Sequence, residues 1–560
     1  MVRAPAGAVD GGTVVYNDRY AWGGDDYAAL ERQAPLWLYA HDGRADYWAA
    51  DLELHPPRLR YRFGLRGTDG TRWFGWDGLR DQPRPRGAFE FAYVAEGDLP
   101  DSPEWARGAI FYHIFPDRFR RSAAGHRRGP VAAWDEPVGR RTFLGGDLDG
   151  VIEGLDHVAS LSVDAVYLTP IFASPSNHKY DTSDYFTVDP DFGGNAALRR
   201  LVAALKGRGM RLILDGVFNH AGSGWPPFVD ARRRGADSPY ARWFYFAGDG
   251  GAAYETWATN VVTMPKLRTS EPELRALVCR IGRFWVEEFG VDGWRLDVAN
   301  EVDHALWRAF RSAVRAANDE AYLVGEVWNP ALPWLRGDQF DSVMNYPFRS
   351  SILDFARGAT DAGSFLDSID WLRAHYPEPV HDFLYNLIGS HDAERPLTAV
   401  GGDRAAVTLA AALLFTLPGA ASIYYGDEVG MAGADDPGCR NGMVWPPERQ
   451  DARLLALYRR LGRLRRQQAH LRAGRYRRLY ELDSLACFSR GDGADRLVVL
   501  ANAGRRRAGV PSRLLADWLG GPAQVVGACA YGSARPSIRT AEFALPAQSV
   551  VVVRRQEESS

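Results

Sequence analysis

Residues 293–301 read GWRLDVANE, and this stretch places charged side chains where a buried strand is expected. Apolar residues alternate with Arg295 and Asp297, which is the two-residue period of a β-strand. Helical patterns flank the stretch on both sides, so it belongs to an alternation of strands and helices whose parallel sheet is buried. Buried parallel strands are normally apolar throughout. The presence of an arginine and an aspartate on one face of a buried strand therefore has to be explained.

The same alternation of short apolar runs with amphipathic helical segments continues along most of the chain. Eight runs have the length and composition of strands, at residues 109–116, 164–172, 211–220, 293–298, 322–328, 341–348, 383–392 and 421–430. A mostly helical connection follows each run. Eight such units predict an α/β fold in which residues 106–472 form a closed (β/α)8 TIM barrel.

Three other regions depart from this alternation. The connection after the third run is far longer than one crossover helix needs, and residues 218–272 within it are rich in glycine, proline and aromatic residues. They predict an inserted lobe above the carboxyl ends of the strands. Short alternating segments separated by turn residues predict an N-terminal β-sandwich-like domain over residues 1–105 and a C-terminal β-sandwich domain over residues 473–560.

Composition excludes several classes of function. The chain has 560 residues and a net charge of −3, without a basic block that could follow a phosphate backbone, so we expect no nucleic-acid partner. The longest apolar run, residues 406–417, is too short to span a bilayer, so we expect no membrane association. The four cysteines show no metal-ligand spacing, and the N-terminus lacks the apolar stretch of a signal peptide. A cytoplasmic location is expected.

Charged and polar residues gather where the predicted strands end. A barrel carries its chemistry at the carboxyl ends of its strands, and the residues found there are Asp215, His220, Arg295, Asp297, Glu326, His391 and Asp392. On a single strand such residues could form a structural ion pair. Three acids from three strand ends would converge on one mouth and repel one another, and this cost favours a functional site.

Two chemistries use a cluster of acids in this way. A metal-dependent hydrolase would bind a cation, but Arg295 already neutralises Asp297 on the same strand face. Glycosyl transfer needs one ionised carboxylate as nucleophile and one protonated carboxyl as acid. Arg295 is expected to lower the pKa of Asp297 by charge and hydrogen bonding. The apolar neighbours of Glu326 and the nearby acids are expected to favour its protonated form.

Four short segments carry a resemblance to a known family. They are DGVFNH (215–220), GWRLDVANE (293–301), VGEVW (324–328) and NLIGSHD (386–392). In order and spacing they resemble the four short regions of the α-amylase family of retaining glycoside hydrolases. MPKL (264–267) and VANE (298–301) resemble the markers of its neopullulanase, cyclomaltodextrinase and maltogenic amylase subgroup.

The resemblance implies a role for each matching residue. Asp297 would be the nucleophile, Glu326 the general acid and base, and Asp392 the carboxylate that binds the 2- and 3-hydroxyls of the sugar at the cleavage point. The implied substrate-binding residues are Tyr180, Asp215, His220, Arg295, Asn300, Glu301, Trp328, His391 and Lys266.

The implied activity is hydrolysis of α-1,4-glucosidic bonds in cyclodextrins, maltooligosaccharides or pullulan, with some transglycosylation. The partner is thus an α-glucan oligosaccharide. Two alternatives stay open: a transglycosylase or transferase on the same fold, and a non-catalytic glucan-binding relative. The resemblance also implies a homodimer built through the N-terminal domain, although that domain is shorter here than is usual in the subgroup.

Lysine usage adds an observation that does not depend on the family. The 67 basic residues include only three lysines, at positions 179, 206 and 266. Lys179 and Lys266 stand inside the segments NHKYD and MPKL. A compact ammonium fits where a guanidinium does not, so we expect packing or ligand contacts to constrain both positions.

Two departures from the family pattern affect the site. His113 stands in the first strand where glutamine is more usual. The loop after that strand, where relatives hold a structural calcium, keeps only Asp147 from the expected oxygen ligands. Nearby stand Arg120, Arg121, Arg127 and Arg128. A guanidinium could neutralise Asp147 directly. We expect no calcium at this site, and no metal or cofactor in the reaction.

Overall fold

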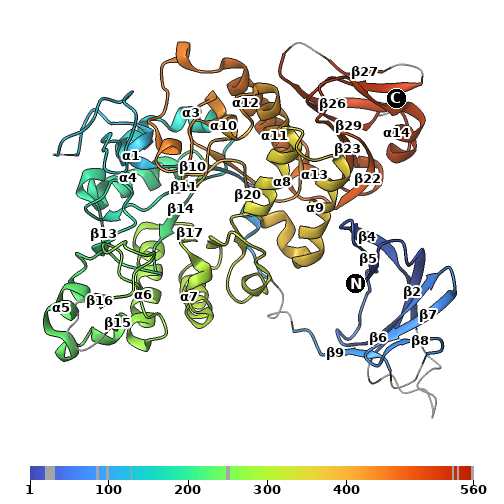
Figure 1. Ribbon diagram of the computed structural model, residues 1–560, viewed down its shortest axis with the longest axis horizontal. Helices are drawn as coiled ribbons and strands as arrows, with labels where there is room; N and C mark the ends of the chain where they lie inside the picture. Colours follow the sequence, from blue (N-terminus) through green and yellow to red (C-terminus); the bar gives the residue numbers. More distant parts are fainter. Residues whose placement is uncertain are drawn as a thin grey trace.

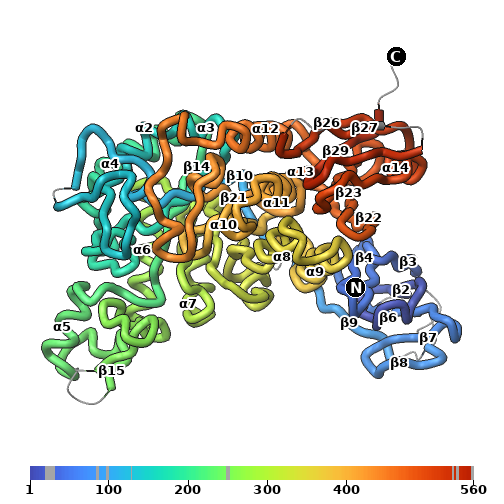
Figure 2. Tube along the Cα trace, turned by 45° about the horizontal axis from the view of Figure 1, so that its top comes forward, coloured from blue at the N-terminus to red at the C-terminus, as the bar shows by residue number. Residues whose placement is uncertain are grey.

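The computed structural model describes residues 1–18, 20, 32–83, 87–95, 100–127, 129–247, 253–532, 535–538 and 541–556. A barrel occupies the middle of the molecule (Figure 1). The N-terminal and C-terminal β domains lie on the same side of the barrel, next to each other, and a small lobe projects at the opposite end, an arrangement also visible in Figure 2.

The barrel consists of eight parallel strands, one in each run predicted from the sequence. They are β10 (Ile110–Ile114), β11 (Ala165–Leu168), β14 (Arg211–Gly216), β17 (Gly293–Leu296), β18 (Tyr322–Gly325), β19 (Ser342–Val343), β20 (Tyr385–Leu387) and β21 (Ala420–Tyr424). Hydrogen bonding joins them in the order β19-β18-β17-β14-β11-β10-β21-β20. A parallel bridge between Met344 and Tyr385 links the two outer strands and closes the barrel. The predicted barrel is confirmed.

The lower part of the barrel is filled by side chains, as a packed core requires. Phe111, Tyr167, Ile213, Tyr322 and Tyr385 point inward from five strands and belong to one buried cluster. Phe111 stacks on Tyr322 with ring centroids 5.7 Å apart. This apolar layer closes the bottom of the barrel, so polar groups higher on the same strands face only the upper mouth.

Helices cover the outside of the barrel. Those that follow its strands are α1 (Pro116–Phe119), α2 (Leu148–Glu153), α3 (Leu155–Ser160), α4 (Gly194–Lys206), α6 (Pro272–Phe289), α7 (His304–Ala317), α8 (Tyr346–Ala356), α9 (Ala362–His375), α10 (Pro396–Ala399), α11 (Arg404–Thr416), α12 (Ala452–Gln467) and α13 (Ala469–Arg472). Aspartates cap several of them: the Asp303 carboxylate accepts from the first amides of α7, and Asp403 and Asp451 do the same for α11 and α12. The apolar α11 is buried from Ala406 to its end at Thr416, as a central covering helix should be.

The inserted lobe contains α5 (Pro226–Arg234) and the two-stranded sheet of β15 (Phe246–Ala247) and β16 (Ala253–Tyr254). Phe228 packs edge-on against Phe244 and Tyr254, which forms a small aromatic core. A bridge between His220 and Lys266 ties the lobe back to the end of β14. A second excursion near the mouth pairs β12 (Phe172–Ala173) with β13 (Asp184–Val188).

The predicted β domains are present on both sides of the barrel sequence. The N-terminal strands are β1 (Val2–Pro5), β2 (Gly11–Asn17), β3 (Arg32–Pro35), β4 (Trp37–His41), β5 (Ala45–Ala49), β6 (Leu59–Gly67), β7 (Gly70–Gly75), β8 (Gly78–Arg80) and β9 (Phe89–Phe91). The C-terminal elements are β22 (Tyr476–Leu482), β23 (Leu485–Arg490), β24 (Leu497–Asn502), β25 (Ala508–Pro511), α14 (Ser512–Leu519), β26 (Ala523–Ala530), β27 (Ser537–Ile538), β28 (Glu542–Leu545) and β29 (Ser549–Arg555). The boundaries at residues 105 and 473 stay predictions.

Among the helices of the described ranges, none combines the length and the apolar character needed to cross a membrane.

Candidate active site

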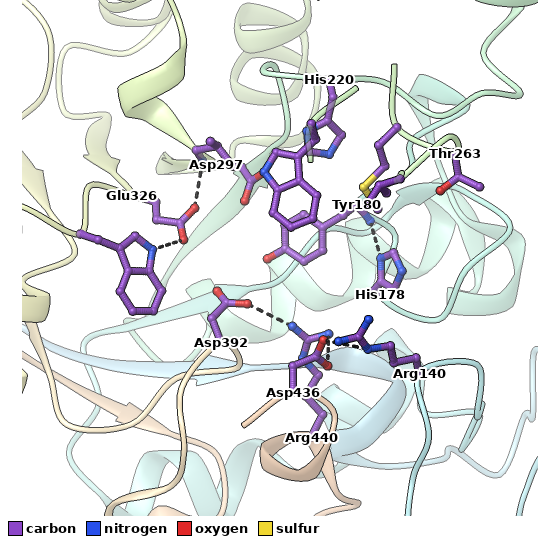
Figure 3. Close-up of a pocket in the computed structure, with 15 residues that line it drawn as sticks. Arg140, His178, Tyr180, His220, Thr263, Asp297, Glu326, Asp392, Asp436 and Arg440 are labelled. Atoms are coloured by element: carbon purple, nitrogen blue, oxygen red, sulfur yellow. Dashed lines mark hydrogen bonds and ion pairs between the residues drawn. The ribbon is translucent and has the colours of Figure 1, made fainter. Parts of the chain in front are cut away.

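The mouth of the barrel contains a cavity of about 550 Å³ into which three acids project from three strand ends. Asp297 follows β17, Glu326 follows β18, and Asp392 lies in the segment after β20. In Figure 3 their carboxyl groups face the same space, with Tyr180 and His220 on its other side. The full lining is Arg140, His178, Tyr180, His220, Trp257, Val261, Thr263, Met264, Asp297, Val298, Glu326, Trp328, Asp392, Asp436 and Arg440.

A single buried guanidinium organises the acids. Arg295, whose side chain is 1% exposed, donates to Asp297 Oδ1 at 2.7 Å and to Asp215 Oδ2 at 3.0 Å through Nη1. Its Nη2 lies 2.9 Å from Glu326 Oε2 and 3.9 Å from Asp392 Oδ2. Four carboxyl groups therefore share one cation. The charged residues of GWRLDVANE indicated only one of these contacts, the one between Arg295 and Asp297.

The net electrostatic effect on Asp297 differs from the one expected. Burial raises the pKa of Asp297 well above its ordinary value, Arg295 opposes that rise, and Glu326 adds to it. Burial also raises the pKa of Asp215 to about 6, against the influence of Arg295 and Tyr167. The expectation of a lowered pKa for Asp297 is therefore wrong in its net direction. The local pattern showed the arginine but not the depth of burial or the number of acids around it.

Glu326 is held from both sides. Its Oε1 accepts a hydrogen bond of 2.9 Å from the Trp328 indole, and its Oε2 accepts one of 2.9 Å from the Val298 amide. The Trp328 ring stacks on Tyr346 with centroids 3.6 Å apart, which fixes its direction. Val298 has a φ of 44°, a region that β-branched residues rarely adopt. This strained turn directly after Asp297 aims an amide at the second acid.

The floor of the cavity is a hydrogen-bonded aromatic layer. The Tyr180 hydroxyl donates to Asp215 Oδ2 at 3.0 Å and also bonds to His391 Nε2. The two rings are stacked, with centroids 5.6 Å apart. Asp215, Arg295 and His391 are buried and do not line the cavity surface.

His220 offers a polar group to the cavity. Burial lowers its pKa to about 3, so the imidazole is neutral at ordinary pH. Its Nε2 atom is buried and has no hydrogen-bond partner within the described residues. A ligand hydroxyl in the cavity would satisfy it.

Lys266 connects the inserted lobe to the segment after the nucleophile strand. Its ammonium lies 2.7 Å from Glu301 Oε2 and donates to Asn219 Oδ1. The Lys266 side chain is 12% exposed and that of Glu301 is 43% exposed. Asn300 is also exposed. Asn300, Glu301 and Lys266 do not line the cavity, but Val298 and Met264, two residues from Asn300 and Lys266 in the chain, do.

Several cavity residues were not singled out from the sequence. Arg440 lies 3.0 Å from Asp392 Oδ1 and 2.9 Å from Asp436 Oδ1, so it is the second cation of the site. Asp436 and Arg440 lie in the segment between β21 and α12, which was not assigned to the site from the sequence. Trp257 comes from the inserted lobe and His178 from NHKYD. Only chain folding brings these segments to the mouth.

The lysine of the NHKYD segment contacts protein groups rather than the cavity. Lys179 is 1% exposed, and its ammonium lies 2.7 Å from Asp189 and donates to the Ser174 carbonyl at 3.0 Å. Packing constrains this position, as expected. Lys179 does not line the cavity.

Asp147 has its hydrogen-bond partners in the start of α2 and in Ser122. Its carboxylate caps α2 by accepting from the Gly150 amide at 2.7 Å, and it accepts from the Ser122 hydroxyl at 2.7 Å. The nearby arginines bind elsewhere: Arg120 pairs with Glu153, Arg121 donates to carbonyls and Arg127 pairs with Asp191, while Arg128 lies outside the described residues. Helix capping, not an arginine, thus satisfies Asp147. Across the part of the chain that the structure describes, no group of three or more His, Cys, Asp and Glu side chains is arranged to hold a metal ion.

Comparison with known proteins places this site in a family. Residues 113–448 match the family model described as the alpha amylase catalytic domain, and residues 2–95 match the alpha amylase N-terminal ig-like domain. The chain belongs to the α-amylase family. It is a glycoside hydrolase of that family, as the four segments at the strand ends indicated.

Individual relatives cover nearly the whole chain. Neopullulanase 2 of Thermoactinomyces vulgaris is 44% identical over 85% of this chain and 82% of its own length. A cyclomaltodextrinase of a Bacillus species is 41% identical over 91% of this chain and 93% of its own. A solved structure named cyclomaltodextrinase superposes with a TM-score of 0.88 at 35% identity, covering 98% of this chain and 95% of that one. The similarity thus extends to the flanking β domains.

Proposed function

We propose that this glycoside hydrolase cleaves α-1,4-glucosidic bonds in cyclodextrins, maltooligosaccharides or pullulan with retention of the anomeric configuration. The observation that carries the proposal is the Arg295 guanidinium, which contacts Asp297 through one nitrogen and Glu326 through the neighbouring nitrogen. Two carboxyl groups bound to one guanidinium stay close together. The retaining mechanism needs this closeness, whereas inversion needs room for a water molecule between acid and base.

Each acid has a distinct part in the reaction. Asp297 attacks the anomeric carbon while Glu326 protonates the departing glycosidic oxygen, which leaves a glucosyl–Asp297 ester. Glu326 then removes a proton from water as the water oxygen attacks the same carbon and releases Asp297. Because burial and mutual repulsion make full ionisation of the cluster unfavourable, the acids retain a proton as a unit at a pH where isolated carboxyls would lose it.

The remaining cavity residues bind the sugar at the cleavage point. Asp392, paired with Arg440, would accept hydrogen bonds from two ring hydroxyls. The unpartnered Nε2 of His220 would bond to another hydroxyl. The Tyr180 ring, held by its stacking on His391, would lie against the apolar face of the sugar. These contacts strengthen as positive charge develops on the ring.

The acceptor side is proposed to include Trp328, Asn300 and Glu301. The Lys266 ammonium holds the Glu301 carboxylate beside the entrance, where it can orient either water or an incoming sugar hydroxyl. Some transglycosylation is therefore part of the proposal. A dedicated transferase would differ by giving mainly longer products, and a non-catalytic glucan-binding protein would give none.

Product analysis tests the proposed function. The purified protein is incubated with β-cyclodextrin, pullulan and maltotriose, with starch as a comparison, and early products are followed by proton NMR. Retention requires that the α-anomer appears first. Early β-anomer would show inversion, and absence of cleavage on all four substrates would contradict the activity.

We also propose that the enzyme acts inside the cell as a homodimer. The four cysteines are free thiols, and Cys439, Cys487 and Cys529 are buried, which suits a reducing compartment. The similarity of the N-terminal domain to the family's ig-like domain supports association through that domain. Sedimentation equilibrium at micromolar concentration would distinguish monomer from dimer.

A further inference from the structure

His113 lies directly beneath the floor of the cavity but does not line it. It belongs to β10, is fully buried, and its Nε2 lies 3.1 Å from Nδ1 of His391. We propose that His113 is a positioning residue: it donates a hydrogen bond that fixes the tautomer of His391, and thereby the directions of Asp392 and Tyr180. This role rests on the proposed function, since it acts through two residues of the sugar-binding floor.

The neighbours of His391 Nε2 require a proton on that atom. Asp392 Oδ2 lies 3.0 Å from it, and an ionised carboxylate can only accept. The Tyr180 hydroxyl also bonds to Nε2 and donates its own proton to Asp215 at 3.0 Å, so its oxygen must accept from His391. One proton on Nε2, directed to the Tyr180 oxygen and close to the Asp392 carboxylate, serves both neighbours, whereas a bare Nε2 would serve neither.

A neutral His391 with its proton on Nε2 has a bare Nδ1, and that buried atom needs a donor. Burial lowers the pKa of both His113 and His391 well below the ordinary value, so each ring carries one proton. The donor facing Nδ1 is His113 Nε2, and His113 Nδ1 has no partner within the described residues. The hydrogen bonds therefore run in one direction, from His113 through His391 and Tyr180 to Asp215.

Aromatic neighbours hold the His113 ring in the donating position. Tyr167 lies with its ring centroid 4.3 Å from that of His113, and Tyr424 lies at 4.9 Å. If His113 served only to fill this space, any side chain of similar volume would replace it. If it serves as a donor, only a side chain with an N–H at its tip can do so. This difference makes the proposal testable.

The test compares His113→Gln with His113→Met. The two side chains are similar in length and unbranched, but only glutamine carries an N–H that can reach His391. With β-cyclodextrin, we expect the glutamine variant to keep kcat/KM within about threefold and the methionine variant to lose about 10- to 100-fold, the effect of a buried acceptor left without its donor. Melting temperatures verify that both variants fold.

Nitrogen-15 spectra of histidine-labelled protein provide the second measurement, with the His391 signals assigned by their loss in His391→Gln. In the wild type, His391 should be protonated on Nε2 and bare on Nδ1. Glutamine at position 113 should preserve this pattern, and methionine should shift the proton toward Nδ1. The wild-type spectrum decides the point even when the methionine variant does not fold.

Several results would overturn the proposal. They are a wild-type His391 protonated on Nδ1, equal losses of activity in both variants, or wild-type activity in the methionine variant. If the wild type cleaves no α-glucan, the proposed function fails, whereas the spectrum still reports whether His113 sets the tautomer. The two failures are thus distinguishable.

Discussion

Arg395 and Arg295 are both buried near the ends of barrel strands, and their surroundings differ in one respect. Arg395 is fully buried, donates to Asp427 Oδ1 at 2.7 Å and to the Tyr425 carbonyl at 2.7 Å, and lies between two aromatic rings. Arg295 is equally buried but lies within 4 Å of four carboxyl groups, three of which open onto a cavity.

The difference separates a structural ion pair from a catalytic one. Arg395 and Asp427 are matched in charge and away from the cavity lining, so their interaction contributes to the fold. The acids around Arg295 outnumber it, and repulsion among them lowers stability. A cost of this kind is tolerated where the charges perform chemistry. Substitutions in the two clusters should therefore affect different properties.

The largest expected effect is on Asp297. Replacing it with asparagine removes the nucleophile, so the covalent intermediate cannot form, and kcat on β-cyclodextrin should fall about 10⁴-fold or more. Release of reducing sugar measures this loss. The melting temperature should hold or rise, because a neutral amide relieves repulsion with Glu326. Near-normal turnover would rule out Asp297 as the nucleophile.

Glu326→Gln should cost somewhat less, since only proton transfer is removed. A loss of about 10²- to 10⁴-fold in kcat is expected on β-cyclodextrin. With 4-nitrophenyl α-maltoside the first step should lose much less, because its leaving group departs without a proton. Comparing the pre-steady-state release of nitrophenol in variant and wild type measures this difference. Equal losses on both substrates would contradict a general-acid role.

Arg395→Met should show the opposite behaviour. Removing one partner leaves Asp427 buried without its counter-charge, and the free energy of unfolding should fall by about 3–5 kcal/mol. Urea denaturation measures this loss, while kcat of the folded variant at 25 °C should stay within about threefold of wild type. The double substitution with Asp427→Leu should recover part of the stability. If Arg395→Met lost activity and kept its stability, the Arg395 pair would not be structural, which would contradict the role assigned to it.

The Arg395 cluster also predicts a pH dependence. Burial raises the pKa of Asp427 to about 7 in the folded protein, whereas an unfolded aspartate titrates near 3.9. The folded state therefore binds the proton more tightly, and this contribution to stability, present below pH 4, is lost as the pH rises toward 7. The stability of Asp427→Asn relative to wild type should increase over that range, by at most about 1.4 kcal/mol per pH unit. Urea midpoints from pH 5 to pH 8 test this, and a relative stability that falls with pH would contradict it.

The smallest effect is expected at the rim of the catalytic cluster. Glu301→His replaces the carboxylate that Lys266 holds, so the ratio of transglycosylation to hydrolysis with maltotriose should change several-fold while total turnover changes less. Chromatography of the products across maltotriose concentrations measures the ratio. Arg283→Gln, on the exposed face of α6, is a matched control that removes a different surface ion pair. An unchanged ratio in Glu301→His would exclude this role.

Predictions from the sequence were most accurate for features that depend on residues close together in the chain. Each of the eight strands overlaps its predicted run, and β21 begins one residue before it, because a run of buried residues is recorded in the local order of the chain. The convergence of Asp297, Glu326 and Asp392 followed from the rule that parallel strands end at one rim. The sequence did not show which group satisfies Asp147: the arginines near it in the chain contact other partners, and the start of α2 uses its carboxylate.

By itself, the sequence determined the barrel, its inserted lobe and the identity of the acids at its mouth, because periodicity and strand order are local properties. Only the tertiary structure decided that Arg440 joins Asp392, that His113 meets His391, and that burial outweighs Arg295 in setting the pKa of Asp297. These pairs are far apart in the chain, and the cost of desolvation depends on everything packed around a group. Neither distance nor dielectric surroundings can be read from neighbouring residues alone.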